Sequence, residues 1–342
     1  MDLQNVVGVG AVMAHIDVDI VEETILRLSE EEEEYKIKDS DVSLRGTPLI
    51  PAGGHQSYYW SRLYTLEPDD HKQQQQPIYC EQVPKDDHSI AVFSDRKVLP
   101  PGLLAACDSL EMVDISPLSY TTAVRETFLI ACSSLTVLDL SPFSLVTTIS
   151  AAFLNSCSSL EWLDLSPLSM VHEIGPAFLA GCSSLKTIDL SPLSKLTVVP
   201  YSFLGGCVAL KTIDLSLLTN VQEVKHSLLT GCTGLTTLNL GMFLKHKVVP
   251  ANFLHNCSGL TAIDLTPFSD VTSVGSFFLD GCSGLTSIDL CPFSQVKTIQ
   301  EGFLGGCISL STIDLRPLTA LGTDLRDKEM GGPNTQILCP TL

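Results

Sequence analysis

Basic side chains are scarce in this chain. Its 342 residues include 20 Lys and Arg against 39 Asp and Glu, which gives a formal net charge of −19 at pH 7. Because phosphate contacts need clustered Lys and Arg, this balance argues against a nucleic-acid-binding protein. All charged residues together make up 17% of the chain, below the usual share of about 25%. The 44% of hydrophobic residues are enough for a sizeable core, and the low charge favours many short buried segments.

Long apolar runs and catalytic signatures are also missing. No run approaches the ~20 residues that span a bilayer, so we expect no transmembrane segment. No basic residue precedes the apolar run from Val6 to Ala14, since the first one is Arg27, and we expect no cleaved signal peptide. No G-x-S-x-G, P-loop, H-E-x-x-H or C-x-x-C spacing occurs, and the histidines of the repeated part fall at four different repeat positions. We therefore expect no enzyme activity, no cofactor and no metal site.

What the sequence does contain is a 25-residue repeat. Cysteine returns at this interval nine times without an insertion, and a leucine follows each cysteine three residues later. The nine cysteines are Cys107, Cys132, Cys157, Cys182, Cys207, Cys232, Cys257, Cys282 and Cys307. One repeat cannot bury its apolar residues alone, so this periodicity predicts a stack in which each copy packs on the next.

The unit that ends at Cys182 shows how one repeat is expected to fold. Successive side chains of a strand face opposite ways, so Leu163 and Leu165 are predicted to point inward and Trp162 outward. Pro167 ends that strand because proline has no N–H to donate. A short helical turn is expected to stop at Gly181, which would cap it. Nine such strands about 4.8 Å apart would form one parallel sheet of about 40–45 Å.

The spacing L-x-x-L-x-L, with Phe178 and Cys182 before the next leucine, resembles the BspA-type leucine-rich repeat of bacterial and protist surface proteins. The resemblance covers residues 92–321. It implies an α/β, β-rich leucine-rich-repeat solenoid of about nine repeats with parallel strands. Two hypotheses for the function stand. The first is a non-catalytic scaffold that binds a protein partner through the concave strands and the rim, and the second, which the resemblance alone implies, is a cell-surface antigen or adhesin of a protist.

Two flanking regions lack the repeat. We expect residues 1–91 to be acidic, of low complexity and partly disordered, because residues 1–95 hold 19 acids and only 7 bases. The spacing of apolar residues predicts one helix in this region, from Asp17 to about Glu34. Residues 322–342 are expected to form an irregular C-terminal tail.

The nine repeated cysteines are predicted to form one buried column of free thiols. Side chains in register point the same way, which is poor geometry for a disulfide, and cysteine behaves as a small buried hydrophobe. Free thiols and the missing signal peptide favour the cytoplasm, whereas the family resemblance favours the cell surface, so the compartment stays open. Cys291 replaces an outward serine and is expected to be the most reactive thiol.

The residue between the two inward positions of the strand is acidic in eight of the nine repeats, and Asn239 takes the remaining place. These acids, the aspartate stripe, are Asp114, Asp139, Asp164, Asp189, Asp214, Asp264, Asp289 and Asp314. A concave face lined by one sign of charge predicts a binding surface for a basic protein partner. The alternative is that each aspartate stabilises the turn into Ser-Pro and is copied with the repeat.

A second candidate site is a basic cluster on one rim. Lys245, His246 and Lys247 follow one another in a repeat that has Met242 where most repeats have proline. Local recognition is one explanation of this cluster, and drift of a degenerate repeat is the other.

Overall fold

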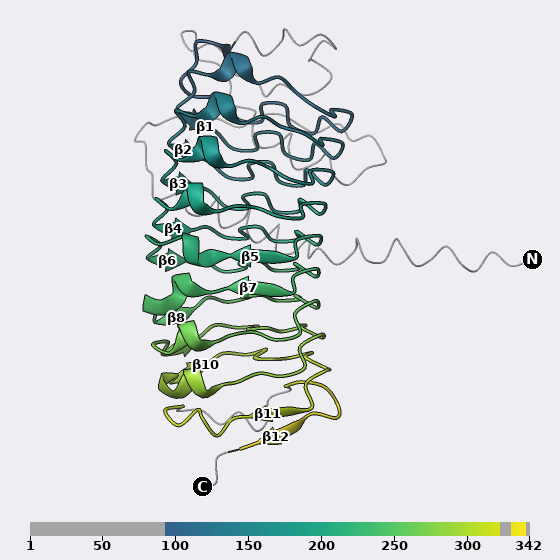
Figure 1. Cartoon of the computed structure of the whole chain (residues 1–342), viewed down its shortest axis with the longest axis vertical. Coiled ribbons are helices and arrows are strands. Elements are labelled where there is room, and N and C mark those ends of the chain that lie inside the picture. Colours follow the sequence, from purple (N-terminus) through teal and green to yellow (C-terminus); the bar gives the residue numbers. More distant parts are fainter. Residues whose placement is uncertain (1–92, 322–329, 340–342) are drawn as a thin grey trace, which may run out of the picture. The chain divides into compact units, whose positions relative to one another are not determined.

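The structure is a computed structural model that describes residues 93–321 and 330–339. The predicted helix from Asp17 to Glu34 and the acidic region 1–91 lie outside these residues. The described repeats stack in sequence order, each turn of chain lying on the one before it (Figure 1). The solenoid of leucine-rich repeats expected from the sequence is therefore confirmed.

One side of the stack carries a column of two-residue parallel strands. The column consists of three separate sheets, and neighbours within each sheet pair with an offset of one repeat, so that Ala123 lies opposite Thr148 and Val124 opposite Ile149. The column contains β1 (Ala123–Val124), β2 (Thr148–Ile149), β3 (Glu173–Ile174), β4 (Val198–Val199), β6 (Glu223–Val224), β8 (Val248–Val249), β9 (Ser273–Val274) and β10 (Thr298–Ile299). Most of these strands bury their second residue and leave the first partly exposed, as the alternation of strand side chains requires.

The leucine-rich segment was expected to form one continuous sheet, and this expectation is wrong. Within residues 93–321 only β5 (Thr212–Asp214), β7 (Thr237–Asn239) and β11 (Thr312–Asp314) are strands at this position. β5 pairs with β7, and both of their repeats lack the usual proline, at Leu217 and Met242. The repeat of β11 keeps Pro317 and still forms a strand, so the loss of proline is not required for pairing at this position.

A 3-10 helix follows the leucine-rich segment in most repeats and turns the chain toward the β1–β10 column. These helices are η5 (Ser116–Leu118), η6 (Ser141–Phe143), η7 (Ser166–Leu168), η8 (Ser191–Leu193), η9 (Leu215–Leu217), η10 (Gly241–Lys245), η11 (Thr266–Phe268) and η12 (Cys291–Gln295). Proline occupies one of the first two positions in all except η9 and η10. Its fixed φ suits the start of a helix, where its missing N–H costs nothing.

The helical turn expected before Gly181 is also absent. Instead the backbone alternates, and Ala177, Leu179 and Gly181 all have left-handed φ values of 58°, 54° and 74°. Their N–H groups bond to other repeats: Ala177 to the carbonyl of Tyr201, and Leu179 to that of Phe153. A left-handed residue other than glycine costs about 1–2 kcal/mol. The bonds between repeats offset this cost, which an isolated helical turn could not do.

The core is a set of buried columns that run through the stack. Phe128, Phe153, Phe178 and Phe203 stack nearly parallel, with ring centroids 5.5–5.7 Å apart. Leu163 is 5% exposed and Trp162 57% exposed, so the predicted inward and outward faces of the leucine-rich segment are confirmed.

The cysteines form a further buried column, as predicted, and the structure adds a role for them. In eight repeats, from Cys132 to Cys307, the thiol donates to the carbonyl of a leucine 28 residues earlier, over 3.1–3.3 Å. These leucines, such as Leu154 and Leu179, are the left-handed ones. Cysteine therefore supplies a small donor for a carbonyl that the unusual backbone turns into the core. Burial raises the pKa of Cys182 and Cys232 to about 12.

The C-terminal segment differs from the irregular tail that was expected. Its residues Gln336–Leu338 form β12, which pairs in parallel with β11 through three residue pairs. Thr335 also donates its hydroxyl to the carbonyl of Leu310, over 2.6 Å. This strand satisfies backbone groups at the end of the leucine-rich column that the last repeat would otherwise leave open.

Candidate functional site

The aspartate stripe occupies the solvent face of the leucine-rich segment. Each aspartate lies one residue before a buried core position and two before the residue that opens the turn. Seven of the eight aspartates are exposed. Asp314 is partly covered, and its side chain is 37% accessible. The stripe lies on the side of the stack that carries β5, β7 and β11 (Figure 1).

Every member of the stripe accepts a hydrogen bond from the backbone. The N–H two residues later donates to the carboxylate over 2.8–3.0 Å in all eight cases. In the first five repeats the serine hydroxyl at that position also donates to the carboxylate, over 2.6–3.1 Å. The turn-stabilising alternative therefore has a clear geometric basis. A carboxylate has about four acceptor sites, so these bonds leave others open to solvent.

The charge of the stripe is largely uncompensated. Arg316 pairs with Asp314 at 2.7 Å. Among residues 93–321 and 330–339, the other seven stripe carboxylates make no ion pair within 4.0 Å. Two charges about 4.8 Å apart repel by about 0.9 kcal/mol in water and about 3.5 kcal/mol at an effective dielectric of 20.

Hydrogen bonding makes four members of the stripe sensitive to acid. The N–H, hydroxyl and thiol donors at the turn lower the pKa of Asp114, Asp264 and Asp289, and the Arg316 side chain lowers that of Asp314 to about 2. A carboxyl whose pKa is lower in the folded state than in the unfolded state stabilises the fold above the unfolded pKa, near 3.8. This contribution is lost as the pH falls through the folded value.

We therefore expect the melting temperature to stay level from pH 7 to about 4.5 and to fall between about pH 4 and 2. Thermal unfolding followed by circular dichroism over this range measures the effect. A D314N variant should lose part of the acid sensitivity. If acidification through pH 4 raises the melting temperature instead, relief of repulsion along the stripe outweighs the turn bonds.

The rim cluster does not present three equivalent cations. Lys245 ends η10 and is exposed, whereas Lys247 pairs with Asp270 of the next repeat at 2.8 Å. His246 is half-buried with its ring 5.3 Å from Phe243, and burial lowers the pKa of its imidazole. Lys245 is thus the one exposed residue of the three that makes no ion pair with a described residue.

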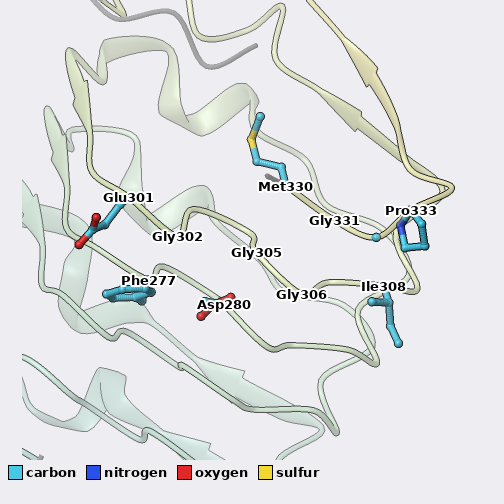
Figure 2. A pocket seen from close by; sticks show the side chains of 11 residues that line it. Phe277, Asp280, Glu301, Gly302, Gly305, Gly306, Ile308, Met330, Gly331 and Pro333 are labelled. Carbon is cyan, nitrogen blue, oxygen red and sulfur yellow. The ribbon is translucent and has the colours of Figure 1, made fainter. Parts of the chain in front are cut away.

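A pocket near the C-terminal end of the array was not foreseen from the sequence. Figure 2 shows the cavity, of about 770 Å³, with Phe277, Asp280 and Glu301 on one side and Met330 and Pro333 on the other. Burial raises the pKa of Asp280, although His255 lies 3.3 Å away and opposes this. Within the part of the chain that the structure describes, no group of three or more His, Cys, Asp or Glu could hold a metal ion.

The pairing of His255 with Asp280 could have been found in the sequence. The two residues are 25 apart and so occupy the same position in successive repeats. Comparing histidines only with one another does not reveal this pair, because the partner of His255 is an acid one repeat away.

Comparison with known proteins places the chain in a family. Residues 97–236 and 197–325 match the family model of the BspA type leucine rich repeat region, with six copies. The chain belongs to this family. BspA-type and related leucine-rich-repeat proteins are typically non-catalytic, usually bind proteins, and are commonly interaction or surface proteins. No curated protein matches the sequence.

Solved structures of bacterial leucine-rich-repeat proteins are similar to this BspA-type chain at low identity. One from Bacteroides ovatus is 17% identical, with a TM-score of 0.43, and the match covers 70% of this chain and 78% of that one. The functional domain of InlJ from Listeria monocytogenes, which includes a cysteine ladder, is 17% identical with a TM-score of 0.34. That match covers 75% of this chain and 60% of the InlJ chain. Among the described residues of this BspA-type protein, no helix has the length and apolar character needed to cross a bilayer.

Proposed function

We propose that this protein is a non-catalytic interaction scaffold that binds a basic protein partner through the aspartate stripe. The observation that carries the proposal is the row of seven carboxylates, exposed and without ion pairs among the described residues, on one face of a rigid stack. A surface lined by one sign of charge raises the local concentration of an oppositely charged partner and speeds its encounter. The net charge of −19 has the same sign and adds to this field.

Asn239 shows whether the turn requires a negatively charged side chain at the stripe position. Its side-chain oxygen accepts from the N–H of Gly241 over 3.0 Å, which is the bond that each aspartate makes in its own repeat. The turn therefore needs a side-chain carbonyl oxygen and does not need a negative charge. Eight repeats nevertheless carry aspartate, which adds a mutual repulsion that asparagine would avoid, and this supports a role in binding.

The test is a triple substitution in the middle of the stripe, D164N/D189N/D214N. A matched control, E173Q/E223Q/E301Q, removes three exposed charges away from the stripe. The fold of the stripe variant should survive, because the amide keeps the turn bond. Proteins captured by each tagged full-length chain from lysate of the source cells are then quantified by mass spectrometry.

We expect the wild-type chain and the control to retain a basic protein that the stripe variant loses by about tenfold or more, a loss of ~1.4 kcal/mol. If all three chains capture the same proteins equally, the stripe serves only the turn and the proposal fails. If the stripe variant unfolds while its folded fraction still binds the partner normally, the proposal also fails.

A further inference from the structure

The first three repeats expose large apolar side chains at positions where later repeats have small or polar residues. Met112, Val137 and Trp162 are 69%, 45% and 57% exposed and occupy the same position in successive repeats. Met112 and Val137 are paired as neighbours in a parallel bridge. Later repeats place Thr187, Thr212, Thr237, Ala262, Ser287 and Thr312 at this position. The three apolar residues, here called the apolar patch, are therefore not required by the repeat.

At a second position, too, the first three repeats carry exposed large apolar residues and later repeats do not. Tyr120, Leu145 and Met170 lie two residues beyond η5, η6 and η7, and are 66%, 51% and 48% exposed. The equivalent residues of later repeats are Lys195, Asn220, Lys245, Asp270, Gln295 and Ala320. Exposed apolar residues that gather in one region mark a surface that another molecule covers.

Charge lies directly beside the apolar patch. Asp114, Asp139 and Asp164 follow its members by two residues, and residues two apart in an extended segment project from the same face. Each of these aspartates is exposed and makes no ion pair with a described residue. The face thus joins a row of apolar side chains to a parallel row of carboxylates.

We infer that the first three repeats bind an amphipathic helix of a partner protein, with its apolar stripe on the patch and its flanking Lys or Arg side chains on Asp114, Asp139 and Asp164. This deepens the proposed function and rests on it. A helix advances 5.4 Å per turn. Paired segments of successive repeats, such as those of Met112 and Val137, lie about 4.8 Å apart, which is close to this rise. Consecutive helical turns can therefore each meet one repeat.

Charge favours a basic helix over two other possible occupants of this face, a second copy of the chain and residues 1–95 of the same chain. A second copy would bring its own aspartates toward this face, and like charges repel. Residues 1–95 of the same chain hold 19 acids and 7 bases, so that region also has the wrong sign. A helix with basic flanks complements both rows.

The probe is a synthetic 18-residue helix with Leu at i, i+3, i+4 and i+7 spacing and Lys at the flanking positions. The chain has two tryptophans, Trp60 and Trp162, so a full-length W60F variant leaves Trp162 as the reporter. Binding should shift Trp162 fluorescence to shorter wavelength, because the helix covers a side chain that is 57% exposed. A peptide with Glu in place of Lys, and a scrambled Leu/Lys peptide, should each bind at least about tenfold more weakly.

M112T/V137T in the W60F background tests the patch itself, and V208T/I308T is the control. Val208 and Ile308 are exposed at 42% and 64% but lie outside the first three repeats. We expect at least about tenfold weaker binding for M112T/V137T and no change for the control. Melting temperatures should be equal, since threonine already occupies this position in later repeats.

The outcomes separate this inference from the proposed function. If D114N/D139N weakens peptide binding and M112T/V137T does not, attraction is by charge alone, so the helix site fails while the stripe function stands. If neither variant changes binding, both fail. Absence of any Trp162 shift in the W60F chain, or self-association in light scattering without peptide binding, overturns the helix site.

Discussion

Replacing Phe178 with alanine is expected to lower the free energy of unfolding by about 3–5 kcal/mol. Phe178 is fully buried, and its ring stacks between those of Phe153 and Phe203 at 5.6 and 5.5 Å. Removing it leaves a cavity that borders three successive repeats. Because each repeat of a solenoid is stabilised mainly by its neighbours, both interfaces of this repeat weaken together. Urea unfolding followed by circular dichroism measures the change.

Thr187→Ala is the matched control for this experiment. Thr187 lies on the solvent face of the adjacent leucine-rich segment, and a substitution there should change stability by no more than about 0.5 kcal/mol. Equal costs for the two substitutions would mean that the burial of the phenylalanine column does not stabilise the stack.

The buried thiols are expected to react with a thiol reagent at least about a thousandfold more slowly than an ordinary exposed cysteine. The thiolate is the reactive form, and a pKa near 12, as for Cys182, leaves only about one thiol in 10,000 ionised at pH 8. Burial also blocks access to the sulfur. Timed labelling of native protein, followed by peptide mass spectrometry, gives a rate for each cysteine, and denatured protein should label at nearly all twelve.

Cys291 is the internal control for labelling, because it is exposed. A hydrogen bond with Asp289 raises the pKa of the Cys291 thiol. Cys291 should therefore react more slowly than an exposed thiol of ordinary pKa, yet much faster than the buried cysteines of the column. Disulfide-linked peptides that join adjacent repeats in a non-reduced digest would contradict the account of the column.

The sequence predicts the burial pattern well because burial follows periodicity. The 25-residue interval defines the columns, and strand alternation separates Leu163 from Trp162. The backbone of the Ala177–Gly181 segment was not predictable in the same way. Leucine disfavours left-handed φ values, so local propensity argues against the conformation that Leu179 adopts. Hydrogen bonds to the previous and next repeats stabilise it, and such bonds depend on the stack rather than on the local sequence.

The candidate site was predictable as a row of residues but not as a set of interactions. The interval places the eight aspartates in one stripe, and the structure adds their bonds to the turn, such as that from the Ser166 N–H to Asp164. The extent of the sheet was not predictable from the prolines alone, since β5 and β7 belong to repeats with Leu217 and Met242 but β11 belongs to a repeat with Pro317. Strand alternation predicts the outward position of Trp162, and the structure adds the exposed fractions of Met112 and Trp162.

The central claim is that the charge of the stripe attracts a basic partner. Its most direct test is the association rate constant of the captured partner with the full-length wild-type chain and with D164N/D189N/D214N, measured from ~0.02 to ~0.3 M salt. We expect the wild-type rate constant to fall by about tenfold or more over this range, and the rate constant of the variant to start lower and change much less. Identical salt dependence of the two chains would show that the charge of the stripe does not attract the partner.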